Sequence, residues 1–210
     1  MYDITLRQLK DRHAKSICSL LPYWITPNII TFIAFIFGLL SCLTAALTAP
    51  TSKSWPLIFW LSNRALDGLD GSLARERRLA SQLGGFLDLL GDFVIYSLLP
   101  IAVAHGVDAD VYGLSAVDWR AVAMVEASFH INNFVLFYIA AVAAKRDRKE
   151  LTSVTMRPAL IEGFESGMIF TAMLVWPGYI TLLCWGMSAA VAVGVVQRVS
   201  YLVPVLKRLD

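Results

Sequence analysis

The sequence predicts an all-α integral membrane protein with six transmembrane helices and an N-terminal amphipathic surface helix. Of its 210 residues, 57% are hydrophobic and only 16% are charged, and the mean hydropathy is +0.62. Soluble domains carry about 25% charged residues, so this composition argues against a soluble protein. A span needs about 20 residues, so the chain has room for six spans with short loops. We expect a single domain over residues 1–210, with the six-helix bundle at 24–206.

The first two elements lie before residue 50. Residues 3–22 place apolar side chains at helical spacing with basic residues between them. This pattern favours a helix lying on the membrane surface, within an interfacial segment at 1–23, over a flexible basic tail. The first span begins at Thr26 and Pro27, because threonine is a good N-cap and proline suits the first helical position. It is expected to end near Ala49.

The other spans follow from the apolar runs and the polar breaks between them. A short turn at 50–54 precedes the second helix, and a loop at 105–118 separates the third helix from the fourth. The five helices are expected at 55–78, 83–104, 119–144, 158–175 and 179–204.

Basic residues predict the orientation of these spans. Cytoplasmic loops are enriched in Lys and Arg. The clusters at 7–15, 75–78, 145–157 and 207–208 fall at alternate ends of the spans, and Lys53 is the only loop cation at the opposite ends. We therefore place the clusters and both termini on the cytoplasmic side.

Charge and cysteine content exclude other classes of function. The net charge is only +2, and the basic clusters are explained by topology, so no nucleic acid is expected as a partner. Cys18, Cys42 and Cys184 are far apart and have no C-x-x-C spacing. They are interpreted as small core residues rather than as a disulfide framework or a zinc site.

Four aspartates lie in apolar sequence, where a charge is costly. Asp67 and Asp70 are three residues apart, and Asp88 and Asp92 are four apart, so each pair lies on one face of its own helix. The short link makes the two helices antiparallel neighbours. Four close carboxylates repel one another unless cations neutralise them. All-oxygen ligands suit Mg²⁺, Mn²⁺ or Ca²⁺, and two such ions could clamp a diphosphate.

Small residues and one arginine accompany the acids. Gly71 and Ala74 leave room for a large ligand beside the helix, and Arg75 supplies a cation for phosphate oxygen. Gly84 and Gly85 are expected to keep the helix of Asp88 and Asp92 slim where it approaches the helix of Asp67 and Asp70.

These residues form one long pattern within residues 67–92, DxxDGxxAR, eight residues, then GxxxDxxxD. In this pattern the chain resembles the CDP-alcohol phosphotransferase family, whose signature it matches at every position. Structural ion pairs or a cation path are the alternative reading of such acids, and eight matched positions argue against it. The resemblance identifies the reaction class and leaves the acceptor alcohol open.

The resemblance implies a role for each motif residue. Two Mg²⁺ or Mn²⁺ ions are held by Asp67, Asp70, Asp88 and Asp92, and the CDP-alcohol is bound by Gly71, Ala74 and Arg75. Asp92 is also the general base that accepts the proton of the acceptor hydroxyl. The expected donor is CDP-diacylglycerol, and the products are a phospholipid and CMP. A homodimer surrounded by membrane lipid is expected by resemblance alone.

Two further questions stay open. Acceptors known for the family include glycerol 3-phosphate, inositol or its phosphate, serine and phosphatidylglycerol, and the reverse arrangement uses CDP-choline or CDP-ethanolamine with diacylglycerol. A phosphorylated acceptor needs cations besides Arg75, and Arg64 and Arg157 are the obvious ones, which slightly favours glycerol 3-phosphate. The competing class is a non-catalytic membrane protein, either a metal carrier or a scaffold. An inactive relative is expected to lose a motif acid, and none is missing.

Other intramembrane polar residues carry alternative roles. Arg64 either counters the acids or meets a substrate phosphate. Glu126 and His130 are four apart and fit an interhelical hydrogen-bond network better than an acceptor site. Glu162 and Glu165 are expected to face the cavity, where they either bind the acceptor or pair with the nearby basic loop.

Overall fold

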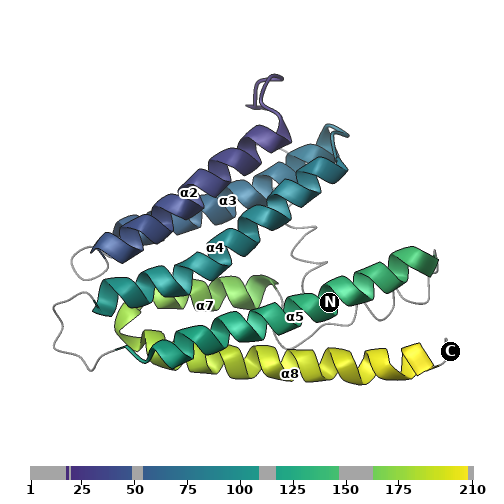
Figure 1. Ribbon diagram of the computed structural model, residues 1–210. Coiled ribbons are helices and arrows are strands. Elements are labelled where there is room, and N and C mark those ends of the chain that lie inside the picture. Colours follow the sequence, from purple (N-terminus) through teal and green to yellow (C-terminus); the bar gives the residue numbers. More distant parts are fainter. Residues whose placement is uncertain (1–17, 19, 49–53, 109–116, 147–162, 208–210) are drawn as a thin grey trace. The chain divides into compact units, whose positions relative to one another are not determined.

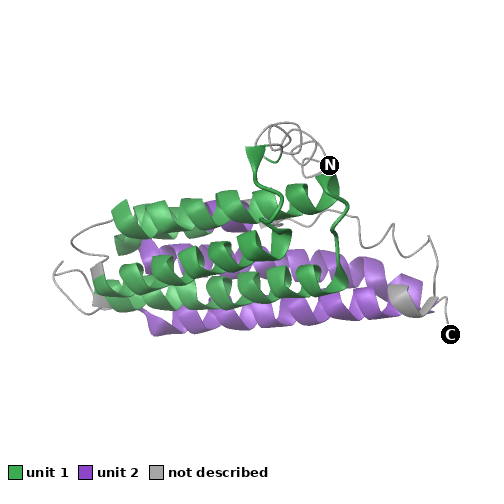
Figure 2. Cartoon of the chain, turned by 90° about the horizontal axis from the view of Figure 1, so that it is seen from above, with its two compact units in different colours: residues 1–116, 170–178 green, residues 117–169, 179–210 purple. Residues whose placement is uncertain are grey.

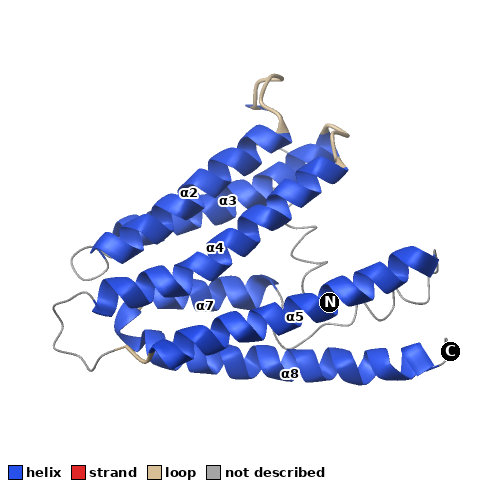
Figure 3. Cartoon of the chain, viewed as in Figure 1, coloured by secondary structure: helices blue, strands red, loops and turns tan. Residues whose placement is uncertain are grey.

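The computed structural model describes residues 18, 20–48, 54–108, 117–146 and 163–207, and within these ranges it contains helices and no strands (Figures 1 and 3). The all-α class is confirmed. The predicted surface helix at 3–22 falls mostly outside the described residues. The helices are α2 (Pro27–Thr48), α3 (Ser54–Glu76), α4 (Gln82–Asp108), α5 (Trp119–Arg146), α7 (Gly163–Val175) and α8 (Ile180–Lys207), with a 3-10 turn at Pro177–Tyr179 before α8.

Four stretches of the described chain are long and apolar enough to cross a membrane: Pro27–Leu47, Gln82–Val107, Trp119–Val142 and Pro177–Lys207. The protein is therefore a multi-pass membrane protein by length and composition. The helix α3 is absent from this group and carries both acids of the first pair. The helix α7 has only 13 residues. Six spans stay a prediction.

The ends of the helices differ from the predicted ones by a few residues. Thr26 is the residue just before α2, as predicted. Its carbonyl accepts the first hydrogen bonds of the helix, from the amides of Ile29 and Ile30 at 3.1 and 3.3 Å. The helix α4 continues to Asp108, four residues beyond the predicted end, because the glycine in that stretch lowers helix propensity without ending the helix.

The helix α3 ends at Glu76, two residues before the predicted end. The amide of Leu79 donates to the carbonyl of Ala74 at 2.8 Å, and the amide of Arg78 donates to the carbonyl of Arg75 at 3.3 Å. These two bonds form a Schellman cap, with Arg78 at φ 56° in the position usually occupied by glycine. An arginine there gave no signal of a helix end in the sequence.

The chain forms two compact units, which Figure 2 shows in green and purple. Unit 1 comprises Met1–Ala116 and Phe170–Gly178, and unit 2 comprises Val117–Ile169 and Tyr179–Asp210. The acidic motif lies within unit 1. The single domain over residues 1–210 stays a prediction.

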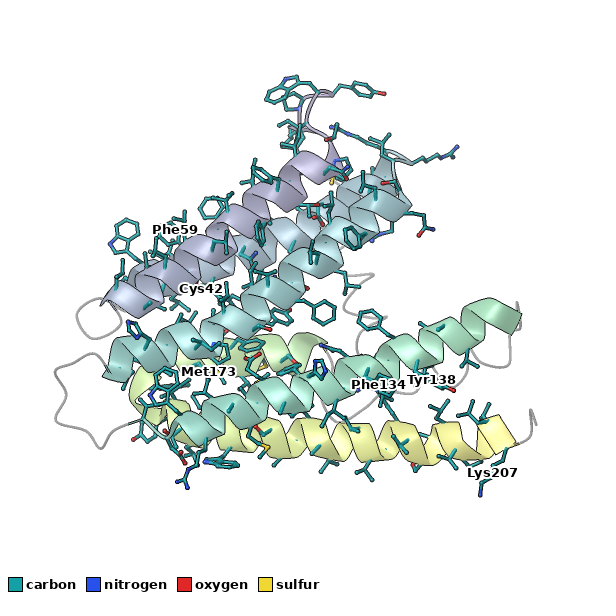
Figure 4. The ribbon with its side chains drawn as sticks, viewed as in Figure 1. Cys42, Phe59, Phe134, Tyr138, Met173 and Lys207 are labelled. Atoms are coloured by element: carbon teal, nitrogen blue, oxygen red, sulfur yellow. The ribbon has the colours of Figure 1, made fainter. Side chains whose placement is uncertain are left out.

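In unit 1, α2 lies alongside both α3 and α4 (Figure 1). Gly38 makes the approach to α4 close, because a Cβ built on it would lie 2.2 Å from the Cδ1 of Ile95. The Nδ2 of buried Asn63 donates to the carbonyl of Ala34 at 2.8 Å, which ties α3 to α2. Phe59 of α3 adds an aromatic contact with Phe37 of α2, with ring centroids 5.9 Å apart (Figure 4).

Arg77, just after the end of α3, forms hydrogen bonds with the chain segment just before α2. Its guanidinium donates to the carbonyls of Leu21 at 2.6 Å and Ile25 at 2.9 Å. Weaker contacts of 3.3 to 3.4 Å reach three more carbonyls in the same segment, those of Cys18, Pro22 and Tyr23. One side chain thus donates to several backbone carbonyls of the segment before α2.

In unit 2, α5 and α8 pack side by side. Val135 and Ile139 of α5 are buried against Leu202 of α8. The guanidinium of Arg198 donates to the Oδ1 of Asn132, so a polar contact joins the same two helices.

Candidate active site

The helices α3 and α4 bring the four motif acids together. Asp88 on α4 interacts electrostatically with Asp70, Asp67 and Asp92, and also with Arg64. The two pairs thus lie near each other, although α3 and α4 both pack against α2 and make little backbone contact with each other, contrary to the close packing expected from their short link. Among the described residues, however, no three or more His, Cys, Asp or Glu side chains are arranged to hold a metal ion. The acids are neighbours without forming a ligand shell.

Asp70 is the most buried of these acids, with 5% of its surface exposed. Thr31 of α2 lies beside it, and the Oγ1 of Thr31 is 2.5 Å from the Oδ2 of Asp70 and 3.1 Å from the carbonyl of Pro27. A hydroxyl has one proton, so we assign it to the shorter contact with the carboxylate. The helix α2 thereby supplies a hydrogen-bond donor to the acidic site.

Asp92 is bound by Arg64. The Nη2 of Arg64 donates to the Oδ1 of Asp92 at 2.6 Å, its Nη1 donates to the Oη of Tyr96 at 2.7 Å, and its Nε donates to the Oδ1 of Asn63 at 2.7 Å. The Oδ2 of Asp67 is 3.6 Å from Nη1. The side chains of Arg64 and Asp92 are 21% and 29% exposed, which makes this a partly buried ion pair.

Two aromatic rings complete the surroundings of Arg64. Its guanidinium carbon lies 5.0 Å from the ring centroid of Trp60 and 5.2 Å from that of Tyr96. The Nε1 of Trp60 donates to the Oγ1 of Thr171 at 2.9 Å, which holds the indole in place. Cation–π contact with two rings adds to the hydrogen bonds in fixing the arginine.

The predicted nucleotide-binding residues lie on the last turns of α3. Arg75 is exposed and runs back along its own helix, where its Nη2 donates to the Oγ of Ser72 at 3.3 Å. A Cβ on Gly71 would meet only this arginine, 3.2 Å from its Nη1. Ala74 is partly buried. The surface beside Gly71 is therefore covered by one flexible side chain.

The two glycines at the start of α4 differ. A Cβ on Gly84 would lie 3.0 Å from the Oδ1 of Asn28 and 3.2 Å from the Oγ of Ser81, so this glycine allows α2 to approach. A Cβ on Gly85 would meet no heavy atom within 4 Å. The close approach was predicted toward the helix that carries Asp67 and Asp70, and the one found at Gly84 is toward α2 instead.

The polar residues that the sequence singled out beyond the motif lie on α5 and α7 or outside the described residues. Glu162, like Arg157, lies outside the described residues, and Glu165 is exposed in the first turn of α7. On α5, Glu126 is partly buried and His130 is exposed. A polar contact between α5 and α8 is made by Asn132, two positions after His130.

Sequence reasoning missed Thr31 and Tyr96 as neighbours of the acids. Tyr96 carried a signal, since it lies four residues after Asp92 and therefore one turn further along the same face of α4. Thr31 carried none, because its contact with Asp70 depends on how α2 packs against α3.

The comparisons with known proteins identify the family of this chain. The family model described as CDP-alcohol phosphatidyltransferase matches residues 24–196. The chain is 32% identical to the inner membrane protein YnjF of Escherichia coli over 175 residues, which cover 77% of this chain and 78% of that protein. It is 36% identical over 86 residues to the bifunctional IPC transferase and DIPP synthase of Thermococcus kodakarensis, or 41% of this chain and 19% of that protein.

Members of this family transfer a phospho-alcohol group from a CDP-alcohol to an acceptor, and they generally depend on a divalent metal. The matched region contains the whole acidic motif together with the helices that surround it. This chain therefore belongs to the CDP-alcohol phosphatidyltransferase family and is a membrane-embedded transferase.

Proposed function

We propose that the protein transfers a phosphatidyl group from CDP-diacylglycerol to a hydroxyl acceptor and releases CMP. The observation that carries this proposal is the convergence of Asp67, Asp70, Asp88 and Asp92 from two helices of one unit, with all eight motif positions present. A phospholipid synthase of this type needs a polar site next to lipid, and these acids lie on helices of a membrane protein.

The same four acids are proposed to hold Mg²⁺ or Mn²⁺. Their chemistry fits, because carboxylate oxygens are the ligands that these ions prefer, although the side chains are not gathered into a ligand shell in this structure. Two bound ions would neutralise the diphosphate and stabilise the attacking and leaving oxygens. Thr31 orients Asp70 for this task, and Arg64 holds Asp92.

Asp92 is proposed as the general base. It accepts the proton of the acceptor hydroxyl, whose oxygen then forms a bond to the phosphorus that carries the lipid alcohol. The bond from that phosphorus to the CMP oxygen breaks, and CMP leaves with the electron pair. Because Asp92 is bonded to a cation, it is a weak base, and its contribution depends on its position beside the acceptor.

The donor is proposed to bind at Gly71, Ala74 and Arg75. The side chain of Arg75 is exposed beside Gly71, at the end of α3. The guanidinium can contact a phosphate oxygen of the donor while the nucleotide lies against Gly71.

Glycerol 3-phosphate remains the first acceptor to test. Arg64 gives donors to Asp92, Tyr96 and Asn63, so it has less to offer an acceptor phosphate than the sequence suggested. This weakens the preference for a phosphorylated acceptor over inositol or serine. Transfer from CDP-choline or CDP-ethanolamine to diacylglycerol is the alternative within the family.

The deciding experiment is an assay of purified full-length protein with CDP-diacylglycerol, Mn²⁺ and a panel of labelled alcohols. We expect CMP release and one labelled lipid, both dependent on the metal. Metal flux into vesicles without any CMP release would instead support the non-catalytic carrier. A second panel with CDP-choline, CDP-ethanolamine and diacylglycerol separates the two directions of transfer.

The orientation and assembly are also proposals. The basic residues at 75–78 support a cytoplasmic position for the nearby acidic site, where soluble acceptors and lipid donors could both reach it. A homodimer follows from the family resemblance alone, and crosslinking in native membranes tests it.

A further inference from the structure

Arg64 stands outside the motif, yet it contacts one motif acid on each of the two helices that carry them. Three of its nitrogens donate hydrogen bonds of 2.6 to 2.7 Å, and two aromatic rings lie within 5.2 Å of its guanidinium carbon. A side chain held on so many sides keeps one position. The arginine is a fixed positive charge built into the site.

The position of this charge matters for any metal that binds. Arg64 lies 2.6 Å from an oxygen of Asp92 and 3.6 Å from an oxygen of Asp67, one acid from each helix. Four ionised carboxylates with Arg64 carry a net charge of −3 instead of −4. In a partly buried site, one charge at such distances changes the binding of a divalent ion strongly.

We propose that Arg64 is a positioning residue that holds Asp92 as an internal counter-ion and thereby lowers the affinity of the acidic site for divalent metal in the absence of substrate. This inference rests on the metal-binding role proposed above for the four acids. The diphosphate of an incoming CDP-alcohol adds negative charge, so full loading with metal is expected to accompany the donor.

Contact with a substrate phosphate is the other role open to Arg64, and the structure disfavours it. Its Nε, Nη1 and Nη2 already donate to three protein oxygens, and the guanidinium carbon lies over the rings of Trp60 and Tyr96. A guanidinium has five N–H groups, so a phosphate would have to share Arg64 with the partners that already take three of them. An arginine reserved for phosphate is expected to have donors directed toward the ligand.

The test measures Mn²⁺ binding to the purified full-length protein without nucleotide or acceptor, from the electron paramagnetic resonance signal of free Mn²⁺. Arg64→Gln is expected to bind Mn²⁺ about tenfold more tightly than the wild type, because it removes the competing charge. Arg64→Lys keeps the charge and is expected to stay within about threefold of the wild type.

Two control variants distinguish the effect of the Arg64 charge on Mn²⁺ affinity from the effects of side-chain packing or of charge elsewhere. Tyr96→Phe removes an acceptor of Arg64 and a hydrogen-bond partner of Asp92 but no charge, and it is expected not to raise Mn²⁺ affinity. Arg120→Gln removes a positive charge that pairs with Asp118 at the start of α5, and it is expected to have no effect. An increase in affinity with either control would overturn the proposal.

A charge-neutral double variant keeps the test decisive where Arg64→Gln folds poorly. Arg64→Gln combined with Asp92→Asn lacks one proposed metal ligand but restores the net charge of −3, so it should bind Mn²⁺ more tightly than Asp92→Asn alone, whose net charge is −2. A double variant as weak as Asp92→Asn overturns the proposal. So does equal Mn²⁺ affinity in the wild type and Arg64→Gln, including no binding by either.

The outcome is distinct from that of the enzyme assay. Protein that shows this order of Mn²⁺ affinities but releases no CMP with any alcohol overturns the proposed function and leaves the role of Arg64 standing. Normal CMP release with an unchanged Mn²⁺ affinity in Arg64→Gln does the opposite.

Discussion

The hydroxyl of Thr31 donates to the carboxylate of Asp70 across 2.5 Å, although 39 positions separate the two residues in the chain. The bond joins α2 to the first acidic pair on α3. A helix that contributes no acid to the site therefore still determines how one of its carboxylates points. The proposed function gives this contact a measurable consequence.

We expect Thr31→Val to raise the Mg²⁺ or Mn²⁺ concentration needed for half-maximal CMP release by about tenfold. Valine has the shape of threonine without the hydroxyl, and a hydrogen bond to a charged group contributes about 1.5 kcal/mol or more. Thr31→Ser keeps the donor and should behave like the wild type. A serine variant as impaired as the valine variant would show that the methyl group, and not the hydroxyl, is what matters.

Asp92→Asn is expected to lower the rate of CMP release by a factor of about 100 to 10,000, the usual range for loss of a general base. Binding of CDP-diacylglycerol should persist, because the residues proposed to bind the donor lie on α3. Labelled donor retained on the purified variant measures this directly. Turnover at the wild-type rate would remove Asp92 from the role of base.

Gly84 and Gly85 form a matched pair for testing the contact between α2 and α4. Gly85→Ala is expected to stabilise the protein by up to about 1 kcal/mol, because alanine favours a helix and the site is open. Gly84→Ala should lose this gain, since its Cβ would press against Asn28. Thermal unfolding in detergent gives both values. Combining Gly84→Ala with Asn28→Ala should restore the gain, and a double variant no better than Gly84→Ala alone would argue against the contact.

Two adjacent arginines at the end of α3 should respond oppositely to substitution. Arg77→Ala removes the donors that reach the carbonyls of Leu21 and Ile25, and we expect it to destabilise the start of α2 by about 1 to 3 kcal/mol. Arg78→Gly relieves a residue at φ 56° and should be neutral or stabilising by up to about 1 kcal/mol. Hydrogen exchange of the first turn of α2 reports the first effect, and thermal unfolding reports the second.

The proposed orientation can be tested with single cysteines in intact bacterial cells. Ala80→Cys, in the link between α3 and α4, should be shielded from a membrane-impermeant maleimide until the cells are permeabilised. Tyr179→Cys, before α8, should react in intact cells. Both positions are exposed, while the three native cysteines are buried, so the wild type serves as the unlabelled control. The reverse labelling pattern would contradict the orientation.

The helices and the pairing of acids were predictable because they depend on local order in the sequence. Apolar runs located the helices to within a few residues, and the spacing of Asp67 to Asp70 and of Asp88 to Asp92 placed each pair on one helical face. The end of α3 was harder to predict, since Arg78 takes the backbone conformation that normally identifies glycine at a helix end.

The partners of the acids could be predicted only in part. Arg64 was expected to counter the acids or to meet phosphate, and its contact with Asp92 depends on which rotamer fits between Trp60 and Tyr96. The bond from Thr31 depends on the packing of α2 against α3. Sequence spacing determines which residues share a helix face, but it does not determine the rotation of that helix against its neighbours.

The polar character of α3 has a consequence for how the protein is made. This helix carries half of the acidic motif and lies outside the stretches apolar enough to cross a membrane alone. We expect α3 by itself to partition poorly from the translocon into the lipid bilayer. It should insert together with α2 and α4, whose Thr31 and Tyr96 bind its polar groups. Variants of those partners would then appear first as failures of biogenesis, with full-length chain made but degraded before it reaches the lipid.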